Sequence, residues 1–143
     1  MQTDNEISRW EEAIISLPDE RFFNTMRLYL GEIKTPYNKQ RLTQKLASFI
    51  YNEKNSNSII TLLDSFDVKI LTAISIISGA TQEILTDFFS ESFRFSEIYA
   101  EIAKLTERLI IYKSKNKIDG REVLKINLLL EEKIKPYLNI KSI

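Results

Sequence analysis

Residues 96–128 of this chain read SEIYAEIAKLTERLIIYKSKNKIDGREVLKINL, and the spacing of the apolar side chains changes partway along them. Up to residue 109 these side chains recur every three or four positions, which is typical of a helix buried along one face. The residues concerned are Ile98, Ile102, Leu105 and Leu109. From residue 110 apolar and polar side chains alternate on both sides of a polar loop, which is typical of a β-hairpin. We therefore predict a helix over residues 96–109 that leads directly into a hairpin over residues 110–128.

The same pattern allows the pairing of the two strands to be predicted. A two-residue Asp119-Gly120 turn would place Lys113 opposite Ile126 and mix charge into the apolar face. A three-residue loop, residues 118–120 with Gly120 left-handed, places Tyr112 opposite Ile126 and buries more apolar surface. We expect the three-residue loop for this reason.

The rest of the chain is predicted to be helical. Residues 67–78 and 81–90 form helices before residue 96, and Asn127 can cap a closing helix. Nearer the N-terminus, a first helix ends at Pro18, and two further helices span residues 19–30 and 38–51. A break rich in Asn and Ser follows over residues 52–57. We expect a mainly α fold with a small β-hairpin, divided into residues 1–57 and 58–143. Helical spacing places Trp10 against the core, together with Phe22, Phe23, Phe88, Phe89, Phe93 and Phe95.

Composition excludes several kinds of function. The 143 residues are 43% apolar and 28% charged, with 20 basic and 20 acidic side chains, so the chain is not a uniformly basic nucleic-acid coat. Because Cys and His are both absent, no disulfide, thiol nucleophile, imidazole base or Cys/His metal site can form. We expect a non-enzymatic binding protein without cofactor or metal. The acidic N-terminal residues and the short apolar stretch 68–80, which contains Lys69, predict a cytoplasmic protein without a membrane span.

The order of the predicted elements resembles a winged helix, in which a third helix faces outward and a hairpin forms the wing. The first half resembles the SAP type of helix, extended loop, helix module. That resemblance is carried by Leu30-Gly31, Ile33, Asn38-Lys39, Leu42 and Leu46. Together the two parts are similar to the amino-terminal region of bacterial proteins related to the XPB type of helicase, with residues 125–138 matching their strand-to-helix ending. The resemblance implies an accessory or DNA-binding role through Lys39 and its neighbours, without a motor, because no GxxxxGK phosphate loop occurs.

Two local groups of basic residues are candidates for binding DNA phosphates. The first is Lys34, Lys39, Arg41 and Lys45, at and after the start of the helix over residues 38–51. The second is Lys113, Lys115, Lys117, Arg121 and Lys125 in the hairpin. The three-residue loop would place Lys113 opposite Lys125 and Lys117 opposite Arg121, and such facing like charges would be relieved by an anion. The alternative is that these residues only solvate a helix face and protect a strand edge from aggregation.

The helix over residues 96–109 supports a different hypothesis. Its outward positions are predicted to be Glu97, Glu101, Lys104 and Arg108, so its first half is acidic and would be repelled by phosphates. This acidic face would suit a protein partner or a second copy of the chain. The sequence therefore leaves two functions open, DNA binding through the basic residues and protein binding through this helix.

Overall fold

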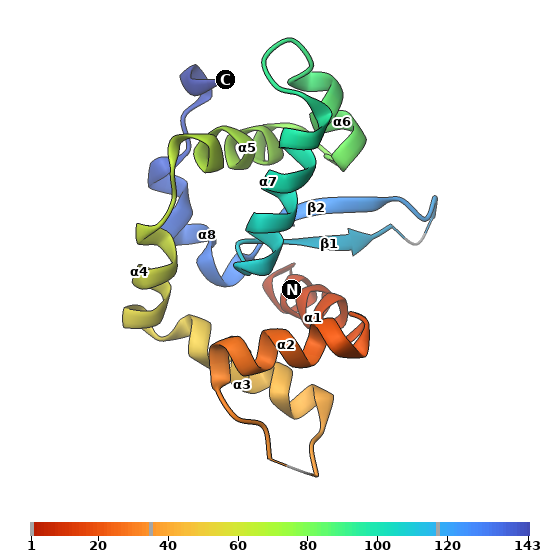
Figure 1. Ribbon diagram of the computed structural model, residues 1–143, viewed down its shortest axis with the longest axis vertical. Coiled ribbons are helices and arrows are strands. Elements are labelled where there is room, and N and C mark those ends of the chain that lie inside the picture. Colours follow the sequence, from red (N-terminus) through yellow and green to blue (C-terminus); the bar gives the residue numbers. More distant parts are fainter. Residues whose placement is uncertain (1, 35, 117) are drawn as a thin grey trace.

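The computed structural model describes residues 2–34, 36–116 and 118–143, except for the side chains of residues 2–4 and 142. Within these ranges it contains eight α-helices and one two-stranded antiparallel sheet, which confirms the predicted mainly α fold with a small hairpin (Figure 1). In chain order the elements are α1 (Gln2–Ile15), α2 (Asp19–Leu30), α3 (Lys39–Tyr51), α4 (Glu53–Thr61), α5 (Ser65–Ile76), α6 (Gln82–Phe88), α7 (Phe95–Glu107), β1 (Ile111–Lys115), β2 (Glu122–Ile126) and α8 (Leu128–Ile134). Two short 3-10 turns, Lys135–Tyr137 and Ile140–Ser142, follow α8.

Local signals explain where the early helices begin and end. Pro18 precedes α2, whose first turn carries Asp19 and Glu20 toward the positive end of the helix dipole. Gly31 ends α2 with a φ of 81°, a conformation that glycine adopts readily. Asn38 caps α3 by accepting a hydrogen bond from the backbone N–H of Arg41 at 3.0 Å. These helix ends lie where the sequence predicts them.

The predicted break over residues 52–57 is wrong, because residues 53–57 belong to α4 and only Asn52 lies between α3 and α4. Asn52 caps α4 by accepting a hydrogen bond from the N–H of Asn55 at 3.2 Å. Ser56 is buried, and its hydroxyl donates to the carbonyl of Glu53 at 3.1 Å. Asn and Ser side chains that favour a loop when unpaired therefore support a helix start here. The predicted division between residues 57 and 58 falls inside this helix.

The two parts of the chain share one hydrophobic core. Trp10 is 1% exposed on α1, and this helix contacts α3, β1 and α8. α8 also contacts α3 and α4, so the C-terminal helix lies against the N-terminal helices (Figure 1). Two of the aromatic side chains predicted to be buried are not, since Phe88 is 48% and Phe95 59% exposed.

Buried Asn127 joins the two ends of the hairpin to the helices beside them. Its side-chain amide donates to the carbonyl of Leu109 at 2.8 Å, and its side-chain oxygen caps α8 by accepting from the N–H of Leu129 at 3.0 Å. Its own N–H donates to the carbonyl of Ile110 at 2.8 Å. Leu109 has a φ of 63°, so the chain turns sharply between α7 and β1 at this point. The predicted capping of the last helix by Asn127 is confirmed.

Candidate nucleic-acid interface

The hairpin is paired in a register that differs from both predicted ones. Ile111 lies opposite Ile126, and Lys113 lies opposite Leu124. The two strands close through a hydrogen bond from the N–H of Asn116 to the carbonyl of Arg121 at 2.7 Å, which leaves residues 117–120 as a four-residue loop. Relative to the predicted loop, the pairing slips by one residue, and a slip of one residue changes which side chains share a face.

Side-chain hydrogen bonds stabilise the longer loop. The side-chain oxygen of Asn116 accepts from the N–H of Ile118 at 2.8 Å, and its carbonyl accepts from the N–H of Gly120 at 2.8 Å. Asp119 accepts from the N–H of Arg121 at 3.0 Å. Gly120 has a φ of 72°, so its predicted left-handed conformation is confirmed. The sequence analysis does not predict the turn formed by the Asn116 side chain, although Asn side chains commonly accept a hydrogen bond from the backbone N–H two residues later.

The observed register removes the predicted pairing of Lys113 with Lys125. Lys113 lies opposite Leu124, and its Nζ is 4.0 Å from Oε2 of Glu122. Lys125 is half-buried opposite Tyr112. The prediction that Lys113 faces Lys125 is therefore wrong, and the predicted partner of Arg121, residue 117, lies outside the described residues.

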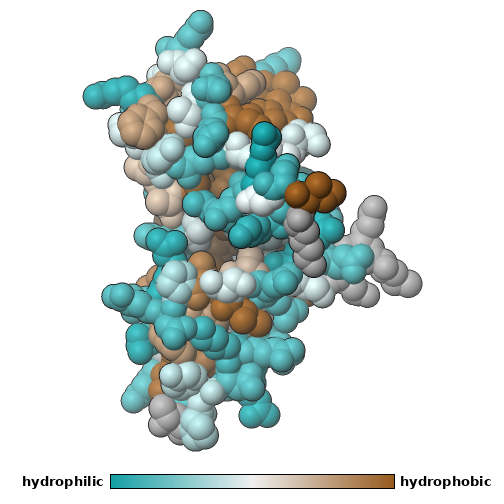
Figure 2. All heavy atoms as spheres, turned by 90° about the vertical axis from the view of Figure 1, so that its right-hand side faces the viewer, coloured by the Kyte–Doolittle hydropathy of each residue, from teal (hydrophilic) through white to brown (hydrophobic). Residues whose placement is uncertain are grey.

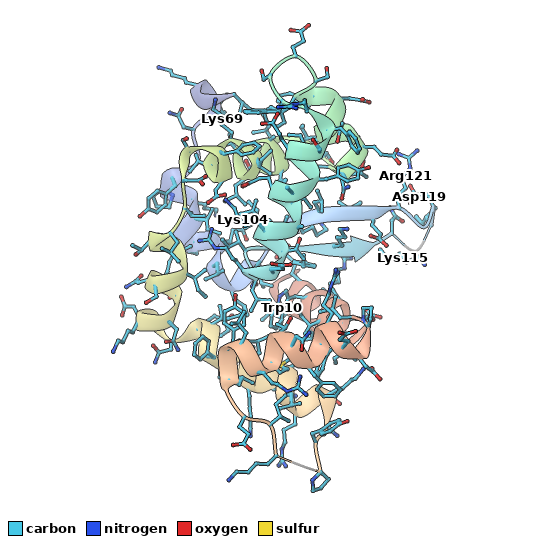
Figure 3. All side chains as sticks on the ribbon, in the orientation of Figure 1. Trp10, Lys69, Lys104, Lys115, Asp119 and Arg121 are labelled. Atoms are coloured by element: carbon cyan, nitrogen blue, oxygen red, sulfur yellow. The ribbon has the colours of Figure 1, made fainter. Side chains whose placement is uncertain are left out.

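The cations of the hairpin remain available to solvent. Arg121 Nε lies 3.9 Å from Oδ2 of Asp119, but the Arg121 side chain is 69% exposed. Lys113 is 42% exposed beside its own acidic neighbour, and Lys115 is exposed near the tip. Exposed ion pairs of this length stabilise a protein by about 0–1 kcal/mol, so they do not prevent the cations from binding another anion. The hairpin projects from the body of the protein, with Lys115 and Arg121 near its tip (Figure 3).

The basic residues of α3 form a separate group. Lys34, Arg41 and Lys45 are exposed, and the first turn of α3 borders an open depression of about 350 Å³ lined by Asn38, Gln40, Arg41 and Gln44. Lys39 is half-buried, and its Nζ pairs with Asp19 and lies 5.1 Å from the centre of the Phe22 ring. Lys39, one of the residues that carry the SAP resemblance, therefore has a carboxylate partner within the protein.

The two basic groups do not lie on one continuous surface. α1 contacts both α3 and β1 and lies between them, and α2 and α3 occupy the end of the molecule below the hairpin in Figure 1. The first turn of α2 carries the carboxylates of Asp19 and Glu20, and Asp19 pairs with Lys39 at the start of α3. Hydrophilic side chains cover most of the middle and lower parts of the face from which the hairpin projects (Figure 2).

Only part of the predicted acidic face of α7 is outward, because Glu97 is exposed but Glu101 is not. Glu101 is 4% exposed, and its Oε1 lies 3.0 Å from Lys104 Nζ. Lys104 also reaches Asp67 Oδ1 at 2.9 Å and Asp64 Oδ2 at 3.4 Å on the first turn of α5. Arg108 donates to Asp67 Oδ2 at 3.3 Å and to the carbonyl of Ile59 in α4 at 3.1 Å. These side chains hold α7 against α4 and α5, so the prediction that Glu101 is outward is wrong.

A signal for this arrangement was present in the sequence. Glu101 lies three residues after Ile98 and four before Leu105, which places it on the buried stripe of the helix. Asp64 and Asp67 have capping-box spacing, and each accepts a hydrogen bond from the backbone N–H of the other, at 2.7 and 2.9 Å. Their part in the cluster could not be inferred from spacing, because it depends on α7 lying across the start of α5.

The environment of the buried cluster moves the pKa values of two carboxyl groups in opposite directions. Burial, with the nearby charge of Asp67, raises the pKa of Glu101 to about 7. Burial alone would raise the pKa of Asp67 too, but hydrogen bonds from Glu101, Lys104 and the Asp64 backbone lower it to about 2. Lys104 Nζ lies 2.9 Å from Asp67 Oδ1, whereas Glu101 Oε2 is buried without a hydrogen-bond partner, and a proton on Glu101 lets this side chain donate a hydrogen bond to Asp67.

The carboxylates of this cluster could also suggest a metal site. One oxygen each of Asp64, Asp67 and Glu101 lies within 4.8 Å of the others. However, Lys104 Nζ lies within 3.4 Å of all three carboxylates and takes the position that a cation would need. The pKa of Lys104 is raised by its hydrogen bonds to Asp67 and Glu101, against the effect of burial. The cluster is therefore a buried ion-pair network with its own cation.

The outward face of α7 is uncharged along its middle. Phe95 is 59% and Tyr99 42% exposed, with their ring centres 4.8 Å apart. Ala100 and Ala103 are exposed further along the helix, and Glu97 and Glu107 are exposed near its two ends. The repulsion of phosphate that the sequence predicted for this helix is consequently weaker than expected.

Comparison with known proteins gives one partial match. Residues 1–51 are similar to a family described as TP_0021_N, an N-terminal domain. The match covers 51 of 143 residues and ends with the last residue of α3, so it spans the first three helices. No curated protein and no solved structure matches the chain significantly. Among the described helices, none combines the length and apolar character needed to cross a membrane.

Proposed function

We propose that this protein binds duplex DNA through its hairpin, without enzymatic activity of its own. The observation that carries the proposal is the projecting ribbon, whose exposed cations Lys113, Lys115 and Arg121 surround a tip held by hydrogen bonds. A two-stranded β-ribbon can enter a groove of duplex DNA, and lysine and arginine neutralise the neighbouring phosphates. The resemblance of residues 58–143 to a winged helix supports the same function, as does the order α5, α6, α7, β1, β2. A cytoplasmic location is part of this proposal.

The separation of the two basic groups makes the hairpin the main contact in this proposal. Lys39 is paired with Asp19, and α1 separates α3 from β1. Arg41 and Lys45 of α3 are therefore suitable control positions, because they are exposed cations of the same type on another surface. If α3 also contacts DNA, their removal will weaken binding as much as removal of the hairpin cations.

A fluorescence titration of labelled duplex DNA tests the proposal. The wild type should bind with a logarithmic salt dependence of about −3, since each of roughly three phosphate contacts contributes about −0.9. The double variant Lys115→Gln with Arg121→Gln should bind about tenfold more weakly and lower the salt slope by about 2. The matched double variant Arg41→Gln with Lys45→Gln should bind like the wild type. Absence of salt-sensitive binding at micromolar wild-type protein would refute DNA binding.

The outward face of α7 favours a second candidate function, the binding of another protein. Exposed aromatic rings beside small residues are suited to packing against a partner helix. This differs from the acidic docking surface predicted from sequence, because Glu101 and most of Arg108 are covered. The replacement Ala103→Arg would place charge on this face without changing the buried cluster. Light scattering and pull-down with the wild type and this variant test the candidate, which is rejected if the variant retains every association of the wild type.

A further inference from the structure

The tip of the hairpin carries an exposed apolar side chain. Ile118 is 96% exposed, more than any other large hydrophobic side chain in the described ranges. Single exposed apolar residues are common on protein surfaces and need no function by themselves. The position of Ile118 is unusual because it lies on the projecting loop whose neighbouring side chains are charged.

The loop holds Ile118 in a defined position. Its N–H donates to the side chain of Asn116 at 2.8 Å, and Gly120 donates to the carbonyl of the same residue at 2.8 Å. The base of the hairpin is anchored, since Leu124 is 2% exposed and its N–H donates to the carbonyl of Ala80 at 2.7 Å. Backbone hydrogen bonds at Ile118 and Gly120, on an anchored base, reduce the conformational freedom that these residues lose on binding, which favours affinity.

The charges around Ile118 indicate the chemistry of its partner. Lys115 ends β1 and Arg121 immediately precedes β2, and both are exposed, with Glu122 opposite Lys115. The nearest acidic side chain, Asp119, accepts a hydrogen bond from the N–H of Arg121 at 3.0 Å and lies 3.9 Å from its guanidinium. An apolar side chain flanked by cations is complementary to a partner whose outer surface is anionic and whose interior is apolar.

We propose that Ile118 enters the base stack of duplex DNA and partly separates one base step. This inference rests on the proposed function, because the cations must first bring the tip to the phosphates. Proteins that bend DNA insert apolar side chains between base steps in this way. A lipid surface offers similar chemistry, but a myristoyl chain, which buries far more CH₂ groups than one isoleucine, gives only marginal membrane binding. We therefore favour a base step over a lipid surface as the partner of Ile118.

The proposal predicts a preference for duplexes that are easier to unstack. Because a mismatched base costs less to unstack than a paired one, the wild type should bind a duplex with one central mismatch about tenfold more tightly than the perfect duplex. The variant Ile118→Ser should lose this preference and keep its dependence on salt. The matched control is Ile140→Ser, since Ile140 is a 68% exposed isoleucine near the C-terminus. Circular dichroism of each variant shows whether the fold is retained.

Fluorescence of 2-aminopurine beside the mismatch gives a second measurement. Unstacking by the wild type and by Ile140→Ser should increase this fluorescence at saturating protein, and Ile118→Ser should not increase it. Salt-sensitive binding without a mismatch preference, or a preference that Ile118→Ser retains, would overturn the wedge and leave DNA binding intact. Failure of the wild type to bind either duplex would refute the proposed function itself. Co-sedimentation with phosphatidylserine vesicles that is lost in Ile118→Ser, with no change in DNA binding, would assign the tip to membranes and overturn the proposal.

Discussion

Replacement of Glu101 by Gln tests the shared proton in the buried cluster. Gln can donate a hydrogen bond to Asp67 and accept one from Lys104, as protonated Glu101 does, but it cannot ionise. The variant should therefore keep the network in its low-pH form at every pH. Glu107→Gln is the matched control, because it makes the same chemical change at an exposed position of the same helix.

The size of the effect follows from the two protonation equilibria. The pKa of Glu101 rises from 4.5 to about 7 in the folded protein, so the folded state holds a proton that the unfolded chain releases between these values. The stability due to this proton is complete below pH 4.5 and is lost as pH rises through 7. At about 1.4 kcal/mol per pH unit, the loss amounts to about 3 kcal/mol by pH 8.

Asp67 has the opposite dependence at lower pH. Its pKa falls from 3.8 to about 2, so its stabilising charge is present above pH 3.8 and is lost as pH falls through 2. The two effects together place the greatest contribution of the cluster to stability near pH 4 to 5. The pKa of Lys104 is raised, so this side chain stays charged throughout the interval.

Urea denaturation followed by Trp10 fluorescence measures the effect, because this buried side chain becomes exposed on unfolding. Between pH 4.5 and 8 the wild type and Glu107→Gln should lose about 3 kcal/mol more stability than Glu101→Gln. At pH 8 the Glu101→Gln variant should be the most stable of the three proteins. If all three lose stability in parallel over this interval, Glu101 does not hold the proton and the account of the cluster is incorrect.

Three further changes test other parts of the fold by urea denaturation. Asn127→Ala removes the cap of α8 and the donor to the Leu109 carbonyl, and should lower the free energy of unfolding by about 2–3 kcal/mol; a loss below about 0.5 kcal/mol would contradict this. Gly120→Ala should cost about 1 kcal/mol, because its φ of 72° is strained for alanine although the added Cβ meets nothing within 4 Å; an unchanged midpoint would show that the loop adapts. Asp67→Asn leaves its two cations without their buried carboxylate and should cost about 3 kcal/mol at pH 5, whereas a neutral or stabilising effect would mean that the network is dispensable.

Helix starts and turn residues could be predicted because their signals are short. Asn38 and Asn127 each cap a helix through a backbone N–H two or three residues later. Gly31 and Gly120 adopt the positive φ that their positions suggest. Asn52 shows the weakness of the same reasoning, since a cluster of Asn and Ser predicts a break but here begins a helix. The residue types indicate that α3 ends here, but whether a loop or another helix follows depends on the packing of α4.

The candidate site was predicted less completely than the fold. The exposed cations of the hairpin lie on a projecting ribbon as expected, but its register could not be derived from apolar spacing, because the hydrogen bonds of Asn116 decide the length of the loop. Glu101 was assigned to the wrong face, since charge alone suggested exposure. Its burial is possible only because Lys104 and a shared proton compensate the two carboxylates.

The sequence by itself determined the mainly α class, the change from helical to alternating spacing after residue 109, and the caps of α3 and α8. These properties depend on interactions within a few residues, so local chemistry is sufficient for them. Only the tertiary structure decided that α1 separates the two basic groups and that the start of α5 meets α7 at Glu101. Contacts between distant segments arise from the joint burial of all the apolar faces, and no single segment contains the information that selects them.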